Sequence, residues 1–166
     1  MRIRLVKLNQ LSGERASIYS AIYEDDPISL FEKFLIENNI SFKSELKDII
    51  LRLKIIGGKT GAREHYFKPH EGKPGDGVCA LYDKPNSNLR LYCIRYGVTL
   101  IIIGGGGHKL KTIRSLQDDP KLKKENLIIR EISKLINEKV SKGIISFTDD
   151  YYDFDGNLDL NSTNYE

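Results

Sequence analysis

Hydrophobic and polar residues follow two different periods along this chain. Apolar and charged residues alternate near the N-terminus, so residues 2–9 are expected to form a strand, and residues 17–24 a second one, joined to it through Gly13. Apolar residues then recur at every third or fourth position over residues 30–35 and 42–53. This spacing predicts two consecutive helices.

Capping and turn residues set the expected ends of these helices. Asp26 is followed by Pro27, which predicts that Asp26 is the N-cap of the first helix and Pro27 its first residue. The pair Gly57-Gly58 predicts the end of the second helix.

From Gly61 onward the period changes to that of strands. Residues 63–68, 78–83, 89–96 and 99–103 are expected to form strands in meander order. The last of these is apolar on both faces, so we expect it to be central or covered on both sides. The four glycines that follow it, at positions 104–107, are expected to form a turn that leaves the strand.

A long amphipathic helix is expected after that turn, with Asp119 as its N-cap and Gly143 at its end, followed by a short strand over residues 144–147. The pattern predicts an α+β fold, in which a small antiparallel, partly mixed sheet packs against an N-terminal helix hairpin and a long C-terminal helix is added. We expect residues 1–148 to form a single domain and residues 149–166 to be an acidic, partly disordered tail.

Charge is divided unevenly between these two parts. The whole chain carries +3, but residues 149–166 hold six of the 23 acids and none of the 26 lysines and arginines, so residues 1–148 carry +9. A basic body indicates a polyanionic partner, nucleic acid first, although a well-solvated surface explains the same charge. We also expect the acidic tail to fold over the basic sheet face as a built-in mimic of RNA or of the antitoxin.

Other features limit the class of protein. No apolar run reaches the roughly 18 residues that a membrane span needs, which favours a soluble cytoplasmic protein without a membrane partner. Cys79 and Cys93 both lie in apolar, strand-like runs and are expected to be reduced core thiols. The histidines have no metal-ligand spacing, so neither a metal nor a cofactor is expected.

One predicted strand, residues 89–96, carries candidate chemistry. Alternate side chains share a face, so Arg90, Tyr92 and Tyr96 are expected on one surface, where a cation and two aromatic rings could hold a phosphate and stacked bases. A salt bridge between Arg90 and a nearby carboxylate such as Asp83 explains the arginine equally well.

The glycine-rich turn is the second candidate. Its backbone N–H groups could approach a phosphate, and His108, Lys109 and Lys111 add a titratable group and two charges. A flexible turn with solvated lysines accounts for the loop alone.

The same segments resemble the core of the RelE/ParE/HigB superfamily of bacterial toxins, over residues 61–112. The resemblance begins with a Lys-Pro entry, Phe67-Lys68-Pro69, and a Gly-Asp-Gly turn that leads into a strand, Gly75-Asp76-Gly77-Val78-Cys79-Ala80-Leu81. The next strand contains an arginine, Leu89-Arg90-Leu91-Tyr92. An apolar strand follows, Leu100-Ile101-Ile102-Ile103-Gly104, and after it come histidine and lysine, His108-Lys109. A strand and two helices before this core fit the order of the family. The extra N-terminal strand, the long C-terminal helix and the acidic tail depart from it.

The resemblance implies a toxin of a type II toxin-antitoxin system that cleaves mRNA, possibly on the ribosome, without a metal ion, and that a separate antitoxin neutralises. By position, Arg90 would stabilise the phosphate, and His108 would be the acid or base, with an ordinary pKa of about 6.5. Lys109 and Lys111 would contribute charge and backbone contacts. Lys68 would bind RNA, and Tyr92 or Tyr96 would stack on a base.

Two other functions fit the same residues. One is a non-catalytic binding protein of the same fold that acts on a protein target, as ParE-type toxins act on gyrase, or a member that has lost its activity. The other is a structural domain whose meander matches the family by chance. Cleavage of RNA would need both Arg90 and His108, whereas inhibition of a gyrase-like target would need neither.

Overall fold

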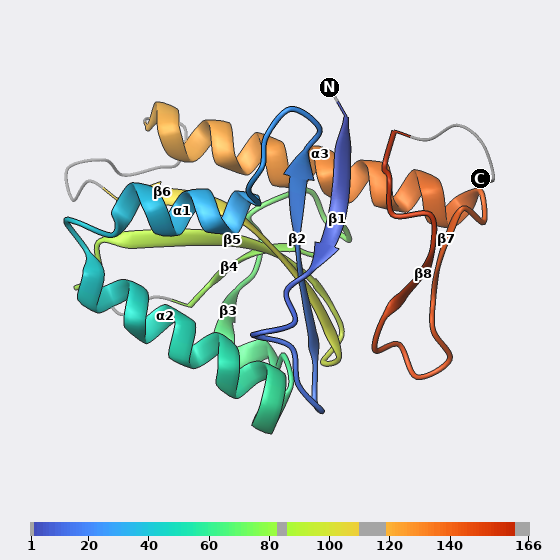
Figure 1. Ribbon diagram of the computed structural model, residues 1–166, viewed down its shortest axis with the longest axis horizontal. Coiled ribbons are helices and arrows are strands. Elements are labelled where there is room, and N and C mark those ends of the chain that lie inside the picture. Colours follow the sequence, from blue (N-terminus) through green and yellow to red (C-terminus); the bar gives the residue numbers. More distant parts are fainter. Residues whose placement is uncertain (1, 83–85, 110–118, 162–166) are drawn as a thin grey trace.

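The protein has an α+β fold built on a mixed six-stranded sheet (Figure 1). A computed structural model describes residues 2–82, 86–109 and 119–161. The strand order is β1-β2-β6-β5-β4-β3, and all neighbours are antiparallel except β2 and β6, which run parallel. The strands are β1 (Ile3–Lys7), β2 (Ser17–Tyr23), β3 (Phe67–Lys68), β4 (Val78–Leu81), β5 (Leu89–Tyr96) and β6 (Leu100–His108).

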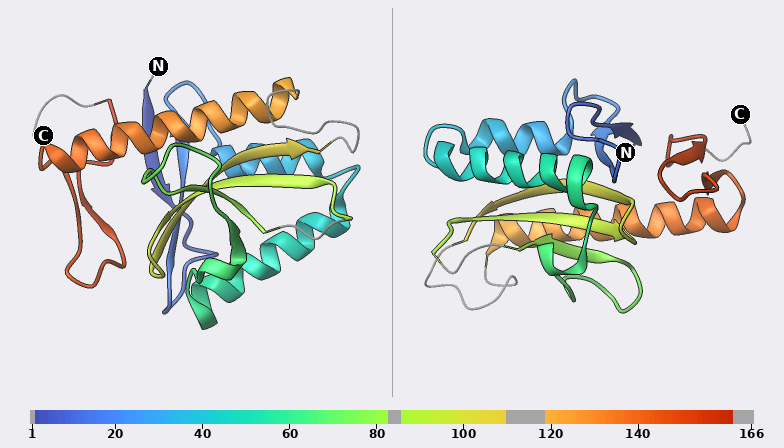
Figure 2. Two further views of the ribbon diagram at one scale, coloured as in Figure 1. Left: turned by 180° about the vertical axis from the view of Figure 1, so that it is seen from behind. Right: turned by 90° about the horizontal axis from the view of Figure 1, so that it is seen from below.

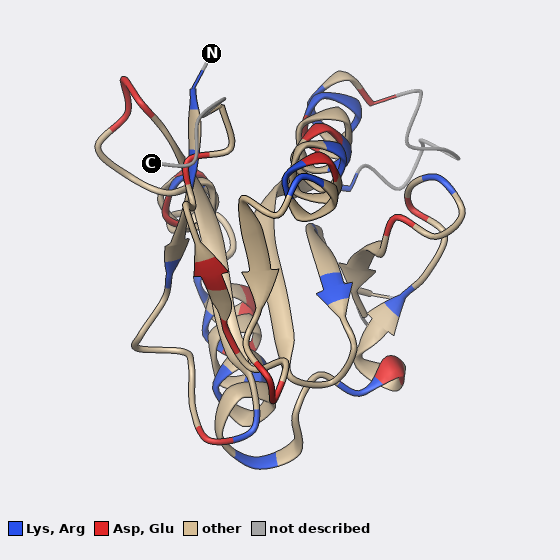
Figure 3. Ribbon diagram, turned by 90° about the vertical axis from the view of Figure 1, so that its right-hand side faces the viewer, with Lys and Arg blue, Asp and Glu red and all other residues tan. Residues whose placement is uncertain are grey.

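Helices cover both faces of this sheet (Figure 2). The consecutive helices α1 (Leu30–Asn38) and α2 (Lys43–Ile55) lie on one face, and the long helix α3 (Pro120–Ser141) lies on the other. A separate two-stranded sheet of β7 (Ile145–Phe147) and β8 (Phe154–Gly156) follows α3. The strands of the main sheet carry few charged residues, whereas the helices carry both signs (Figure 3).

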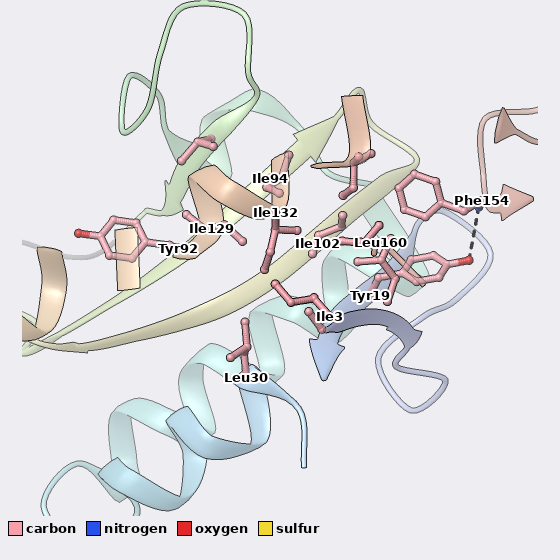
Figure 4. Close-up of a cluster of buried hydrophobic side chains, with 14 of the residues drawn as sticks. Ile3, Tyr19, Leu30, Tyr92, Ile94, Ile102, Ile129, Ile132, Phe154 and Leu160 are labelled. Atoms are coloured by element: carbon pink, nitrogen blue, oxygen red, sulfur yellow. Dashed lines mark hydrogen bonds between the residues drawn. The ribbon is translucent and has the colours of Figure 1, made fainter. Parts of the chain in front are cut away.

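The long helix begins and ends where the sequence predicts. The carboxylate of Asp119 accepts hydrogen bonds from the backbone N–H groups of Lys121, at 2.9 Å, and Leu122, at 3.1 Å. The left-handed backbone of Gly143, with φ of 72°, follows its end. Its apolar stripe packs on the sheet through residues such as Ile129 and Ile132 (Figure 4).

The first helix begins later than predicted. Its N-cap is Ser29, whose hydroxyl accepts from the N–H of Glu32 at 3.2 Å, while Asp26 forms an ion pair with Lys33. Ser29 also donates its hydroxyl to the Glu32 carboxylate at 3.4 Å, and it caps the helix N-terminus from the position next to its first residue, which Asp26 cannot do from three residues upstream.

The second helix also continues past its predicted end. A π-helical turn, Ile56–Thr60, extends it through the two glycines, and the backbone turns away at Gly61, with φ of 77°. Gly57 does not end the helix; it lets the backbone of residues 11–16 pack closely against the helix. Its carbonyl accepts from Arg15 and Ala16, and a Cβ at Gly57 would lie 2.1 Å from the carbonyl oxygen of Leu11.

The four glycines at 104–107 do not form a turn; they lie within β6. A β-bulge interrupts the pairing with β5, because Cys93 pairs with Ile103 while Leu91 pairs with Gly106. The glycines let α3 lie close to the sheet: a Cβ at Gly104 would lie 2.9 Å from Ile129, and one at Gly105 would lie 2.5 Å from the Glu125 carboxylate. The expected turn was wrong because glycine marks both turns and close backbone approach.

The prediction for the apolar strand is confirmed. Ile101, Ile102 and Ile103 in β6 are fully buried, and the strand lies between β2 and β5 with helices on both sides. Cys79 and Cys93 are also buried free thiols, paired across β4 and β5. A hydrogen bond from Cys79 and burial both raise the pKa of Cys93.

The acidic tail is folded through Asn161, and it does not cover Arg90. Its backbone bonds to β1, where the N–H of Leu5 donates to Leu158 at 3.0 Å and the N–H of Leu160 donates to Ile3 at 2.9 Å. The Asp153 carboxylate lies 2.9 Å from the Lys7 ammonium. The described residues of the tail lie along β1 and beside Tyr96 at the end of β5, away from Arg90, and the mimicry stays a prediction.

None of the helices in the described parts of the chain is long and apolar enough to cross a membrane.

Candidate functional site

Arg90 lies at the start of β5 on the face that α3 covers. Its side chain is 20% exposed, and its guanidinium lies 3.9 Å from the carboxylate of Glu71. Both interpretations of this arginine therefore find support. It has a carboxylate partner, although not Asp83, which lies outside the described residues, and it remains accessible at one side.

The aromatic residues of the same strand are not available for base stacking. Tyr92 is completely buried under α3 (Figure 4), and burial raises its pKa. Tyr96 is half-buried, with its ring centroid 5.4 Å from that of Phe147 and 5.7 Å from that of Phe154. The expectation that either ring stacks on an RNA base is wrong, because each ring already packs within the protein.

Three polar atoms on this face are buried without a hydrogen-bond partner in the described structure: the Tyr92 hydroxyl, the Tyr96 hydroxyl and Nε of Arg90. Burial raises the pKa of Tyr92, and the charge of Arg90 and a long hydrogen bond with its guanidinium partly lower it, so the Arg90 guanidinium lies beside this hydroxyl. Unsatisfied buried polar groups are unfavourable, by roughly 1–3 kcal/mol each. Tyr92 is completely buried, so Arg90, with a side chain that is 20% exposed, is the residue here that can offer a donor to a polar ligand.

The β-bulge separates His108 from Arg90. Leu89 pairs with His108, and Arg90 pairs with Gly107. Directly paired residues share a face, so His108 lies with Leu89 on the α1 and α2 side, where its ring centroid is 4.9 Å from that of Phe42. Without the extra residue, His108 would fall on the face of Arg90, because a one-residue shift reverses every side chain.

Two lysines accompany Arg90 on its own side. Lys68 in β3 pairs with Ala80, and Ala80 pairs with Tyr92, so these three residues form one row on the α3 face. Lys109 follows β6, and its ammonium lies 3.1 Å from the Ser87 hydroxyl. Burial lowers the pKa of Lys109, and the nearby positive charge of Lys68 lowers it further. Lys111, also expected at the site, lies outside the described residues.

Glu71 is the site residue that the sequence did not reveal. It lies in the connection between β3 and β4, where no motif distinguishes it from other surface acids. Two buried side chains of α3 hold this connection: Asn126 Nδ2 donates to the carbonyl of Glu71 at 2.7 Å, and the Ser133 hydroxyl donates to the carbonyl of Asp76 at 2.7 Å. Buried polar residues at helical spacing, 126 and 133, are the signal that could have indicated a tethered loop.

The arrangement combines a guanidinium, two ammonium groups and a carboxylate at one end of the sheet, where β5 begins and β6 ends (Figure 1). We name this set, Lys68, Glu71, Arg90 and Lys109, the cationic cluster. Cations of this kind bind phosphate, and an adjacent carboxylate can accept a proton. Within the described residues, no group of three histidine, cysteine or acidic side chains is placed to hold a metal ion.

Comparison with known proteins assigns no relative. No protein-family model, no curated protein and no solved structure matches the chain.

Proposed function

We propose that the chain is a toxin of RelE/ParE/HigB type that binds RNA at the cationic cluster and cleaves it without a metal ion, and that a separate antitoxin neutralises it. One observation carries the proposal: Arg90 lies in a mostly buried position with Lys68 and Lys109 on its side of the sheet and unused donor capacity. The order β2, α1, α2 and then the strands β3 to β6 also supports it, because this is the order that the resemblance implies.

The proposed reaction is attack of an RNA 2′-hydroxyl on the neighbouring phosphate. The O2′–P bond forms, the P–O5′ bond breaks, and the products are a 2′,3′-cyclic phosphate and a free 5′-hydroxyl. Arg90 stabilises the charge that develops on the phosphate oxygens. Glu71, next to Arg90, accepts the proton of the 2′-hydroxyl, and Lys109 donates one to the leaving oxygen. A lowered pKa makes the Lys109 ammonium a stronger acid than an ordinary lysine.

His108 has no part in this reaction, because it lies on the opposite face of the sheet. The site thus differs from the one that the sequence predicts: the proton transfers are assigned to Glu71 and Lys109 in place of the histidine.

Coverage by α3 favours a second function. The helix buries Tyr92 and Ile94 on the face that RNA would otherwise contact. A protein with this face closed could act by binding a protein target, as the non-catalytic alternative holds.

Induced expression in bacteria tests the proposal. We expect wild-type protein to arrest growth and to generate new 5′ ends in total mRNA. Arg90→Ala and Glu71→Gln should lose both effects, by at least about 100-fold in cleavage, because each removes a group that acts on the reacting phosphate. His108→Ala is the matched control and should behave as wild type.

Other outcomes separate the alternatives. Growth arrest without new RNA ends would favour the protein target. Loss of cleavage in His108→Ala but not in Glu71→Gln would refute the assignment of the proton transfers. No arrest and no cleavage by the wild type would overturn the toxin proposal.

A further inference from the structure

A groove runs along α3, and the loop that forms its other wall continues from Glu71 of the cationic cluster. It has a volume of about 700 Å³ and lies between α3 and the β3–β4 connection. Lys73 lies on one wall, and Arg130, Lys134 and Lys142 on the other. Positive side chains therefore face the groove from two separate elements.

Three of the basic residues that line the groove, Lys73, Arg130 and Lys134, carry the argument. In the described parts of the chain, Lys73, Arg130 and Lys134 form no ion pair. Lys73 and Lys134 are exposed. Three acids also line the groove. Of these, the Asp76 carboxylate accepts the backbone N–H groups of Lys73, at 2.7 Å, and Val78, at 2.9 Å, so it is already satisfied.

The groove is continuous with the cationic cluster through one tethered loop. Lys73 lies two residues after Glu71, and Asn126 and Ser133 fix this loop to α3 at Glu71 and Asp76. Arg130 lies one helical turn beyond Asn126, and Lys134 lies one turn beyond Arg130, so each is displaced by about 6 Å along the helix axis. This rise is similar to the spacing of phosphates along an extended single strand.

We propose that this groove is a second RNA-binding surface, which holds the phosphate backbone of the strand whose scissile phosphate lies at Arg90. The inference rests on the proposed function and adds to it a path for the substrate and single-stranded RNA as its form. A charged groove that follows the backbone without reading bases suits a single strand of varied sequence. Lys73, Arg130 and Lys134 are the residues that define it.

Fluorescence anisotropy with 2′-O-methyl oligouridine tests the groove separately from cleavage, because this probe has no 2′-hydroxyl to react. A probe of about 16 nucleotides is long enough to cover the groove and the cationic cluster, whereas one of about 4 nucleotides covers the cluster alone. The double variant Arg130→Gln/Lys134→Gln should bind the long probe at least about 5-fold more weakly. Its logarithmic salt slope should fall by about 1.4, at roughly 0.7 per lost phosphate contact. Binding of the short probe should not change.

The control removes the same charge elsewhere. Lys47→Gln/Lys54→Gln changes two exposed lysines of α2, on the opposite face of the sheet, and should leave the affinity for the long probe and its salt slope near the wild-type values. Equal losses in the two double variants would overturn the groove, since net charge alone would then explain binding. If RNA affinity falls in Arg90→Ala but not in Arg130→Gln/Lys134→Gln, the groove proposal is overturned and the proposed function is kept. A wild type without affinity for either probe overturns both.

Discussion

The two faces of the central sheet differ in what they bury. The face under α1 and α2 holds an apolar cluster in which Phe34, Leu53 and Ile101 are completely buried. The face under α3 is also apolar at its centre, but it contains Arg90 and two tyrosine hydroxyls without partners. Buried apolar contacts stabilise a fold, while unsatisfied polar groups destabilise it. The first face is thus built for stability, and the second gives up some stability at the candidate site.

The largest expected effect tests the apolar face. Phe34→Ala should reduce the free energy of unfolding by about 3–5 kcal/mol, because it removes a completely buried ring from the α1–α2 cluster. Chemical denaturation measures the change. Ile36→Ala, at a position 66% exposed on the same helix, should alter stability by less than about 0.5 kcal/mol. Similar losses in both variants would contradict this account of the face.

The glycines of β6 give the next effect. In Gly106→Ala the new Cβ would lie 1.8 Å from the carbonyl oxygen of Arg90, which is backbone and cannot move alone. We expect a loss of about 1–3 kcal/mol or more. Gly105→Ala meets the end of the Glu125 side chain, which can rotate, so its loss should be smaller. Denaturation curves that rank Gly105→Ala as the more harmful change would be inconsistent with the bulge described here.

Alkaline pH should destabilise the α3 face through its buried tyrosines, and the other face through Cys93, whose pKa is raised by a hydrogen bond with Cys79 and by burial. Burial raises the pKa of Tyr92 and of Tyr96 above the ordinary value of 10.0. The unfolded chain therefore loses these protons first, so the stabilising effect is complete below about pH 10 and is lost as pH rises through the folded-state values. Stability should fall by about 1 kcal/mol per pH unit for each tyrosine. Chemical denaturation between pH 9 and pH 11 measures how steeply the free energy of unfolding falls with pH. The double variant Tyr92→Phe/Tyr96→Phe should make this fall less steep.

The smallest expected change in stability concerns the hydroxyl of Tyr92 on the α3 face. Tyr92→Phe removes an unpaired buried hydroxyl, so the free energy of unfolding at pH 7 should stay the same or rise by up to about 1 kcal/mol. A loss of stability above about 1 kcal/mol would show that the hydroxyl has a partner and that this face is not under strain.

The sequence predicted the elements of the fold better than their assembly. Asp119, Pro120 and Gly143 mark α3 correctly because capping chemistry is local. Which face of the sheet this helix covers was not predictable, since an apolar stripe specifies that a helix packs but not where. The burial of Tyr92 follows from that tertiary choice.

The candidate site was half predictable, for a reason that one residue illustrates. Strand alternation correctly placed Arg90 on the face opposite to Leu89 and Leu91. His108 was expected in a turn after the glycines, but β6 continues through it, and the bulge in β6 places it on the face opposite to Arg90. Glu71 was missed because a loop has no period from which a neighbour in space can be inferred.

The closure of the sheet edge has a consequence for the order of folding. The N–H of Ile3 donates at 2.6 Å to the side chain of Asn161, a partner 158 residues later in the chain. During synthesis β1 emerges about 150 residues before the segment that caps its outer edge. Contacts of such high sequence separation slow folding, because a long loop must close before they form. A nascent chain therefore carries β1 with an open outer edge until residues 158–161 have been made.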